Sequence, residues 1–182
     1  MGFNETKATQ AAARLLTKRG GQMSYMKLIK LLYLADREAL GRWGRPITTD
    51  RYVSMDKGPV LSHILNRIND EPCPGDTSFW AEHIQNSAGY SVSLIKNPGD
   101  DKLSEAEDSL LDEIFAEFGS KTRWQLVDYV HTLPEWTDPH GGSLPVEYRD
   151  ILKAQQKDPA EIEAIESELE GLAAIDRLCA IA

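Results

Sequence analysis

Apolar residues recur at three- and four-residue intervals along much of the chain, which is the spacing of amphipathic helices. The first such segment runs from about Glu5 to Arg19 and ends at Gly20-Gly21, a pair that favours a turn. The second runs from Ser24, a candidate N-cap, to about Leu40. Its apolar residues cover most of its circumference, so we expect this helix at the centre of the core.

Start signals predict further helices along the rest of the chain. Pro59 suits the first turn of a helix, where its missing N–H costs nothing, and we interpret Pro145 and Pro159 in the same way. Two capping boxes, each a Ser or Thr followed three residues later by Glu or Gln, begin at Ser104 and Thr122. The expected helices cover residues 58–68, 104–118, 122–130, 145–153 and 158–172.

The period of the pattern changes in the middle of the chain. Residues alternate with a period of two through 80–84 and again through 90–94, and residues 85–89 supply a turn, which predicts a β-hairpin. A lone hairpin is marginally stable in water, so it must pack on the helices. Residues 47–55 fit an extended segment, and residues 70–78 predict a loop. The predicted fold class is mainly α (α+β): a single compact helical domain of about six to eight helices with a small β-hairpin packed on it.

Composition places the chain among soluble globular proteins. It has 182 residues, of which 41% are hydrophobic and 27% charged. No run approaches the roughly 18 consecutive apolar residues of a membrane span, and the N-terminus lacks the basic-then-apolar order of a secretory signal. Cys73 and Cys179 are too few and too far apart for a disulfide framework or a zinc motif. We therefore expect a cytoplasmic protein with reduced thiols and no membrane contact.

The net charge of −9 hides an asymmetry between two parts of the chain. Residues 1–69 carry twelve Lys and Arg against five Asp and Glu, whereas residues 70–182 carry eight against twenty-four. Two interpretations remain open. The acidic part could steer a partner through its field, or the two parts could face each other and largely neutralise.

The last predicted helix carries a narrow apolar seam on an otherwise acidic surface. Ile162, Ile165, Leu169 and Leu172 step by three, four and three residues, which is the spacing used between paired helices. The seam can dock on its own domain, or it can form a homodimer or receive a partner helix.

Candidate catalytic and metal-binding groups are sparse. Among the four histidines, none pair at the i, i+4 spacing of helical zinc sites. His131, Glu135 and His140, with Asp138 nearby, share one irregular segment and are the best candidate metal ligands, although zinc wants three or four well-held ones. There is no phosphate-binding glycine loop and no serine nucleophile elbow. We expect no metal, no cofactor and no enzymatic activity, and a metal-dependent enzyme is the least favoured alternative.

Nucleic-acid binding is the stronger alternative, as a regulatory binding domain without catalysis. Basic residues cluster within residues 14–30, where two predicted helices flank a glycine turn in the manner of a helix-turn-helix. However, the second helix is too apolar to lie in a groove of DNA, and a pI near 4.9 opposes attraction to phosphates. Nucleic acid is therefore not the expected partner.

Five short motifs stand in order between about residues 24 and 140, beginning at Met26, Gly44, Lys57, Leu103 and His131, and together they resemble the motifs of the Panacea (SocA-like) antitoxins. The run from Met26 to Ala35 is similar to the family's KLxKLLYxA helix, and Gly44-Arg45-Pro46 to its Gly-x-Pro turn. Lys57-Gly58-Pro59-Val60 matches its Gly-Pro-Val step, and Leu103-Ser104 its helix start. His131 and Pro134-Glu135-Trp136 resemble its closing His…Pro-Trp element, from which Glu135 departs by separating proline from tryptophan. The expected division is an N-terminal helix (1–23), a motif-bearing core (24–140) and an acidic helical extension (141–182).

The resemblance implies an antitoxin that binds and silences a toxic protein encoded by a neighbouring gene. We expect exposed rings at three aromatic positions, because aromatic residues and arginine anchor protein interfaces. The candidate partner-binding residues are Trp43, Arg45, Tyr52, Lys57, His131, Glu135 and Trp136; the three rings are those of Trp43, Tyr52 and Trp136. One mechanism is that an acidic surface within residues 100–182 occupies a basic toxin site as a phosphate mimic, which predicts binding that weakens steeply with salt.

Overall fold

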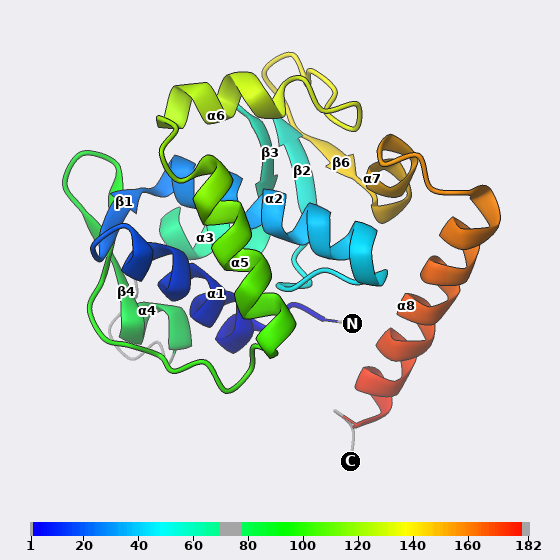
Figure 1. Ribbon diagram of the computed structural model, residues 1–182, viewed down its shortest axis with the longest axis horizontal. Helices are drawn as coiled ribbons and strands as arrows, with labels where there is room; N and C mark the ends of the chain where they lie inside the picture. Colours follow the sequence, from blue (N-terminus) through cyan, green and yellow to red (C-terminus); the bar gives the residue numbers. More distant parts are fainter. Residues whose placement is uncertain (1, 70–77, 180–182) are drawn as a thin grey trace.

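Helix α2 lies at the centre of an α+β fold. The computed structural model describes residues 2–69 and 78–179, and that part of the chain forms eight helices and six short strands. Figure 1 shows α2 crossing the middle of the molecule with α1 and α5 beside it. The predicted fold class is confirmed. The helices are α1 (Glu5–Lys18), α2 (Tyr25–Trp43), α3 (Ser62–Asn69), α4 (Phe79–His83), α5 (Glu105–Phe118), α6 (Arg123–Val130), α7 (Tyr148–Ala154) and α8 (Pro159–Cys179).

The wide apolar face of α2 explains its position. Twelve of its nineteen residues are buried, so the helix needs neighbours on several sides. It contacts α1, α5, α6, α7 and strand β3. The prediction of a central second helix is confirmed, and four polar residues are carried into the interior with it: Lys27, Lys30, Tyr33 and Asp36.

Two small antiparallel sheets flank the helices. In the first, the predicted hairpin gains a third strand from the N-terminal part of the chain, with Met23 opposite Val92. In the second, the centre strand pairs Tyr52 with Leu61 on one side and with Val146 on the other. The first sheet has the order β1 (Gln22–Ser24), β5 (Ser91–Leu94), β4 (Ile84–Ser87), and the second has the order β3 (Gly58–Leu61), β2 (Tyr52–Met55), β6 (Leu144–Val146).

The helix predicted to start at Pro59 begins later. Residues 58–61 form β3 instead, because they pair with β2, and α3 starts at Ser62. The buried Asp50 carboxylate accepts hydrogen bonds from the backbone N–H groups of His63 and Ile64, so it satisfies the first turn of α3 from outside the helix.

Two further element boundaries also differ from the prediction. Trp80, predicted in the hairpin, lies in α4, where the Ser78 side chain accepts from the Ala81 N–H, and the strand begins only at Ile84. Pro145 lies in β6 rather than at a helix start, because residues 144–146 pair with β2. Residues 70–77 of the predicted loop lie outside the described residues.

Local capping signals were the more reliable predictors. Both capping boxes are present, with Ser104 at the start of α5 and Thr122 at the start of α6. Gly119 ends α5 as expected. Ser24 does occupy the N-cap position of α2, but its hydroxyl makes no capping hydrogen bond.

Helix α8 packs along one side of the body and contacts α7. Ile162 and Leu169 are buried, and Ile165 lies against Gly44 at the end of α2. The first part of the predicted seam therefore docks on the chain's own core. Further along the helix Ile175 and Leu178 are exposed, and Figure 1 shows this end projecting away from the other helices.

Within residues 2–69 and 78–179, no helix is both long enough and apolar enough to cross a membrane.

Candidate functional site

The two lysines of α2 are buried and use their amines differently. Lys27 donates to the carbonyl oxygens of Gly119 and Lys121, both at 2.6 Å, and so holds the α5–α6 turn. Lys30, one turn further along, is 1% exposed and its Nζ donates to the carbonyl oxygen of Pro59 at 2.7 Å. Burial lowers the pKa of Lys30 to about 7, because a charged amine is poorly solvated there.

Gly58 lets the β2–β3 turn pass directly over this lysine. Its φ is +89°, a left-handed conformation that glycine adopts without strain. A Cβ built at this position would lie 2.4 Å from Cγ2 of Val130 and 3.3 Å from Nζ of Lys30. The turn, the lysine and the end of α6 are therefore packed too closely for any side chain at this residue.

Replacing Gly58 with alanine is expected to lower the free energy of unfolding by about 2 kcal/mol, from backbone strain together with displacement of Val130. Chemical denaturation of the two proteins measures the difference. Gly141 is a matched control, because it also has a positive φ (+86°) but no atom lies within 4 Å of its added Cβ. If Gly58→Ala lowers the free energy of unfolding no more than Gly141→Ala does, the close approach of Gly58 to Val130 does not contribute to stability.

The closing His…Trp element covers the same turn. The His131 ring stacks on the Trp136 indole with centroids 4.0 Å apart and an interplanar angle of 22°. The indole Nε1 donates to the carbonyl oxygen of Met55. His131 N–H donates to the Val127 carbonyl oxygen, as expected of a residue at the end of its helix. These contacts fix the β2–β3 turn against α6.

Glu135, the departure from the motif, is a buried counter-ion. Its carboxylate accepts from Arg37 Nε at 2.6 Å and from the Tyr33 hydroxyl at 3.0 Å. Burial and the nearby Glu135 carboxylate raise the pKa of Tyr33 well above its ordinary value. Glu135 therefore ties the segment after α6 to α2 and is not presented to solvent.

Asp36 forms the centre of a second buried network on α2. Its carboxylate accepts from the backbone N–H groups of Ile47 and Thr48, both at 2.9 Å, and from the Thr48 and Tyr52 hydroxyls. Burial raises the pKa of Asp36 to about 6 despite these four donors. The network holds the chain after the Gly44-Arg45-Pro46 turn against α2.

The expectation that Tyr52 exposes its ring is wrong. The side chain is 1% exposed, because β2 is the centre strand of its sheet and the ring packs edge-on against Tyr33. Trp43 is 38% exposed and Arg45 and Lys57 are exposed, whereas Trp136 is half-buried by its contacts with His131 and Met55.

A pocket of about 320 Å³ opens beside Lys30, and we call it the Lys30 pocket. Its walls come from the start of α2, from the β2–β3 turn and from α3, with Gly141 and Gly142 at one edge. Apolar side chains form most of the lining. The lining residues are Tyr25, Met26, Ile29, Lys30, Met55, Asp56, Lys57, Val60, Leu65, Asn69, Gly141 and Gly142.

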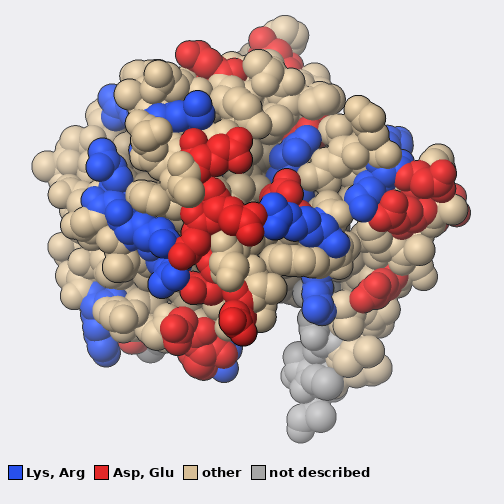
Figure 2. Space-filling model, in the orientation of Figure 1, with Lys and Arg blue, Asp and Glu red and all other residues tan. Residues whose placement is uncertain are grey.

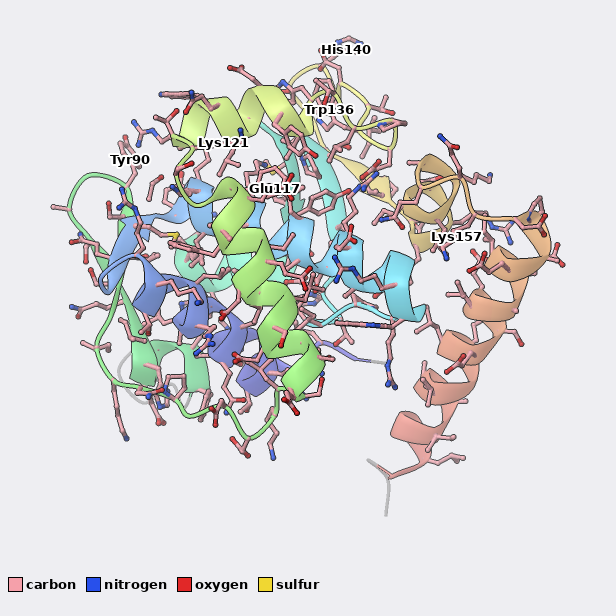
Figure 3. All side chains as sticks on the ribbon, viewed as in Figure 1. Tyr90, Glu117, Lys121, Trp136, His140 and Lys157 are labelled. Carbon is pink, nitrogen blue, oxygen red and sulfur yellow. The ribbon has the colours of Figure 1, made fainter. Side chains whose placement is uncertain are left out.

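Two residues of the pocket lining, Lys57 and Tyr25, each lie near an exposed aromatic ring outside the lining. Lys57 Nζ lies 5.8 Å from the centroid of the half-exposed Trp124 ring, and the Arg123 guanidinium lies 5.4 Å from it. Tyr25 packs against Tyr90, which is strongly exposed on the β4–β5 turn. Figure 3 shows Tyr90 on that turn and Trp136 on the loop that follows α6.

Tyr52 and Glu135 are buried, and the other five predicted site residues fall into two groups. Lys57, His131 and Trp136 lie at the β2–β3 turn, whereas Trp43 and Arg45 lie at the far end of α2 beside α8. The predicted site residues did not include Lys30, which the structure places in the lining of this pocket. A lysine in the apolar stripe of the second helix was the available signal, because lysine is rarely fully buried unless it is paired.

The candidate metal ligands do not converge. Glu135 is paired with Arg37, and the strongly exposed His140 lies 3.6 Å from its neighbour Asp138. Figure 3 shows His140 pointing away from the body. Among the described residues there is no group of three His, Cys, Asp or Glu side chains that could hold a metal ion.

The basic and acidic parts of the sequence face each other in part. Figure 2 shows an acidic band between basic side chains on one face of the molecule. The acids come from α5, and Asp112, for example, pairs with both Arg14 and Lys18 of α1. Further pairs join Arg14 to Asp108 and Arg42 to Glu113. The α5 acids are thus largely matched by basic partners, which favours the interpretation that the two parts neutralise.

The comparisons with known proteins identify one family. A protein-family model described as "Antitoxin SocA-like, Panacea domain" matches residues 28–137. Comparison with curated proteins and with solved structures gives no significant match. The matched residues include Lys30, Gly58 and Trp136, so they contain most of the Lys30 pocket, whereas α7 and α8 lie outside the match.

Proposed function

Since the chain belongs to the SocA-like antitoxin family with the Panacea domain, we propose that it neutralises a cognate protein toxin by direct binding. The toxin is encoded by a neighbouring gene, and binding requires no catalysis by this chain. The family match over 110 of the 182 residues, from 28 to 137, carries the proposal.

The surface around the two ends of α2 supports direct binding. Protein interfaces are enriched in aromatic residues and arginine, which act as anchors. Trp124 and Lys57 are exposed at one end of α2, and Trp43 and Arg45 at the other. We propose that these four side chains touch the toxin. The buried Tyr52 and Glu135, and His131 stacked on Trp136, support the surface from beneath.

Growth rescue tests the proposal most directly. The neighbouring open reading frame is expressed alone and then together with this chain. We expect the neighbour to arrest growth, and co-expression to restore it through a complex that co-purifies with fixed stoichiometry. Toxicity that persists beside soluble, folded chain would contradict the proposal.

A charge reversal at Lys57 tests, in the same growth-rescue assay, whether this residue contacts the toxin. Lys57→Glu is expected to reduce rescue, because it reverses the charge beside Trp124 without touching the core. Lys102→Glu is the matched control, since this exposed lysine precedes α5 and pairs locally with Asp101. Equal rescue by both variants would remove Lys57 from the proposed interface.

The phosphate-mimic mechanism now rests on α8 rather than on α5. Basic side chains match the α5 acids, whereas Glu163, Glu168 and Glu170 of α8 are exposed and form no ion pair among the described residues. We propose this acidic surface as a second contact. Affinity for the toxin is then expected to fall steeply with added salt. An affinity that salt leaves unchanged would contradict it and favour apolar contacts through Ile175 and Leu178, through which a homodimer could also form.

A further inference from the structure

Lys30 is a buried cation with an incomplete set of partners. An ammonium group carries three N–H donors, and within the described residues the Pro59 carbonyl oxygen is its one acceptor. No carboxylate in that part of the chain forms an ion pair with it. The other basic residues of α2 differ, because Lys27 has two carbonyl acceptors and Arg37 has the Glu135 carboxylate.

The lysine lines an open pocket rather than a closed core. A volume of about 320 Å³ is at the small end of the roughly 300–1,000 Å³ range of ligand pockets, so it suits one or two side chains. Met26, Ile29, Val60 and Leu65 give it apolar walls beside the amine. Such a lining fits a carboxylate carried on an apolar stem, or flanked by apolar residues, better than it fits a strongly hydrated ion.

The charges at the pocket also favour an acidic occupant. Its lining carries the two cations Lys30 and Lys57 against the single acid Asp56. The Asp56 carboxylate accepts from the Gly141 backbone N–H, and it forms no ion pair with either lysine. A carboxylate that enters the pocket therefore meets unmatched positive charge.

We propose that the Lys30 pocket receives an aspartate or glutamate side chain of the toxin, whose carboxylate accepts hydrogen bonds from Lys30 Nζ. This inference rests on the proposed function, and it names one contact between this chain and the toxin. Flanking apolar residues of the same toxin segment pack on Met26 and Leu65, and Lys57 and Trp124 close over the outside.

The receiving geometry is already formed without the partner. Gly58 and Pro59 hold the β2–β3 turn against Lys30, and Trp136 fixes the turn from the other side through the Met55 carbonyl oxygen. A preformed site loses little conformational entropy on binding. Lys30 belongs to the pocket lining although the residue as a whole is only 1% exposed, so the pocket is the side from which a carboxylate approaches the amine.

Proton uptake is a consequence of this arrangement. Burial holds the pKa of Lys30 at about 7, and a carboxylate beside the amine raises the pKa again. Binding above about pH 7 therefore takes up a proton, and affinity falls as pH rises through the bound-state pKa. The other ionisable groups at the amine are Asp56, Lys57 and Tyr25 of the lining, with His131 across Gly58.

The test supplies the carboxylate from within the chain. Met26 precedes Lys30 by four residues on α2, so Met26→Glu places a carboxylate one turn before the amine, in the favourable Glu-to-Lys order. Met26→Gln has the same size without the charge. Titration of lysine side chains by NMR is expected to show a higher Lys30 midpoint in Met26→Glu than in Met26→Gln. Equal midpoints would overturn the inference, and this measurement needs no toxin.

Affinity for the toxin is then compared among the same variants. Met26→Glu is expected to bind at least about tenfold more weakly than Met26→Gln, because the pocket is already occupied. Lys30→Met should show a similar loss, while Lys102→Met, which removes a lysine outside both the pocket lining and the proposed interface, should not. Circular dichroism checks that each variant is folded.

The outcomes separate this inference from the proposed function. A toxin that binds wild type, Met26→Glu, Met26→Gln and Lys30→Met equally well would overturn the inference and leave the antitoxin role standing. A neighbouring gene product that does not bind even the wild-type chain would overturn the proposed function, and with it the identity of the occupant.

Discussion

Replacing Asp36 with alanine is expected to lower the free energy of unfolding by about 4 kcal/mol, because each buried donor left without an acceptor costs roughly 1–3 kcal/mol. Two backbone N–H groups, of Ile47 and Thr48, and two hydroxyls, of Thr48 and Tyr52, lose their acceptor together. Urea denaturation at neutral pH measures the change. The effect is large because one side chain serves all four donors in the interior.

Asp36→Asn is the matched control, and a much smaller loss is expected from it. The amide oxygen can accept from the two backbone N–H groups, and the amide nitrogen can donate to the two hydroxyls, which rotate to accept. Asp36→Asn should also remove a pH effect. Burial raises the pKa of Asp36 from 3.8 to about 6, so the folded protein binds more protons than the unfolded chain between these values.

The sign of that effect follows from linkage. Where the folded state binds the extra proton, the free energy of unfolding decreases as pH rises. Wild type should therefore lose stability relative to Asp36→Asn between about pH 4 and about pH 6. If Asp36→Ala lowers the free energy of unfolding no more than Asp36→Asn does, the four hydrogen bonds to Asp36 do not stabilise the fold.

The stability of the wild-type protein is expected to rise by about 3 kcal/mol relative to Lys30→Met between about pH 7 and about pH 9.5, at ~1.4 kcal/mol per pH unit. Burial lowers the pKa of Lys30 from 10.5 to about 7. The unfolded chain therefore binds more protons than the folded protein within that window, and raising the pH removes this advantage of the unfolded state.

Urea denaturation of both proteins across this pH range gives the difference directly. The other lysines and the tyrosines titrate in both proteins, so their contributions to the pH dependence cancel when wild type is compared with Lys30→Met. Lys30→Arg is a useful second variant, because an arginine stays charged throughout and should remain destabilised at every pH. A constant difference between wild type and Lys30→Met would mean that Lys30 keeps its ordinary pKa.

Elements with local signals could be predicted from the sequence. The α5 and α6 helices each begin at a capping box, in which the stabilising groups lie three residues apart and are visible in the sequence. Helix α2 could be placed at the centre because its own residues are apolar around most of its circumference. Such features depend on neighbours along the chain.

Elements that depend on distant partners could not be predicted. Gly58 and Pro59 resemble a helix start, yet β2 pairs with them, and β6 joins β2 from more than eighty residues away. The burial of Tyr52 follows from the same sheet, since a centre strand is covered on both edges. Pairing energy across such separations leaves little trace in the local pattern.

The candidate site was predicted in part. The motif residues drew attention to Lys57, His131 and Trp136, which do lie together at the β2–β3 turn. The role of Glu135 as the counter-ion of Arg37 could not be foreseen, because 98 residues separate the two. Lys30 was visible as a charge within an apolar stripe, but the pocket beside it requires three segments of the chain to meet.

The length of α2 has a consequence for how the toxin would be held. Nineteen residues span about 28 Å, with the Lys30 pocket at the first turns and Trp43 and Arg45 at the last. A toxin that reaches both ends is bound bivalently, so the second contact forms at a high effective concentration once the first is made. Loss of one contact then weakens the complex without abolishing it. Substitutions at both ends together should abolish growth rescue more completely than either one alone.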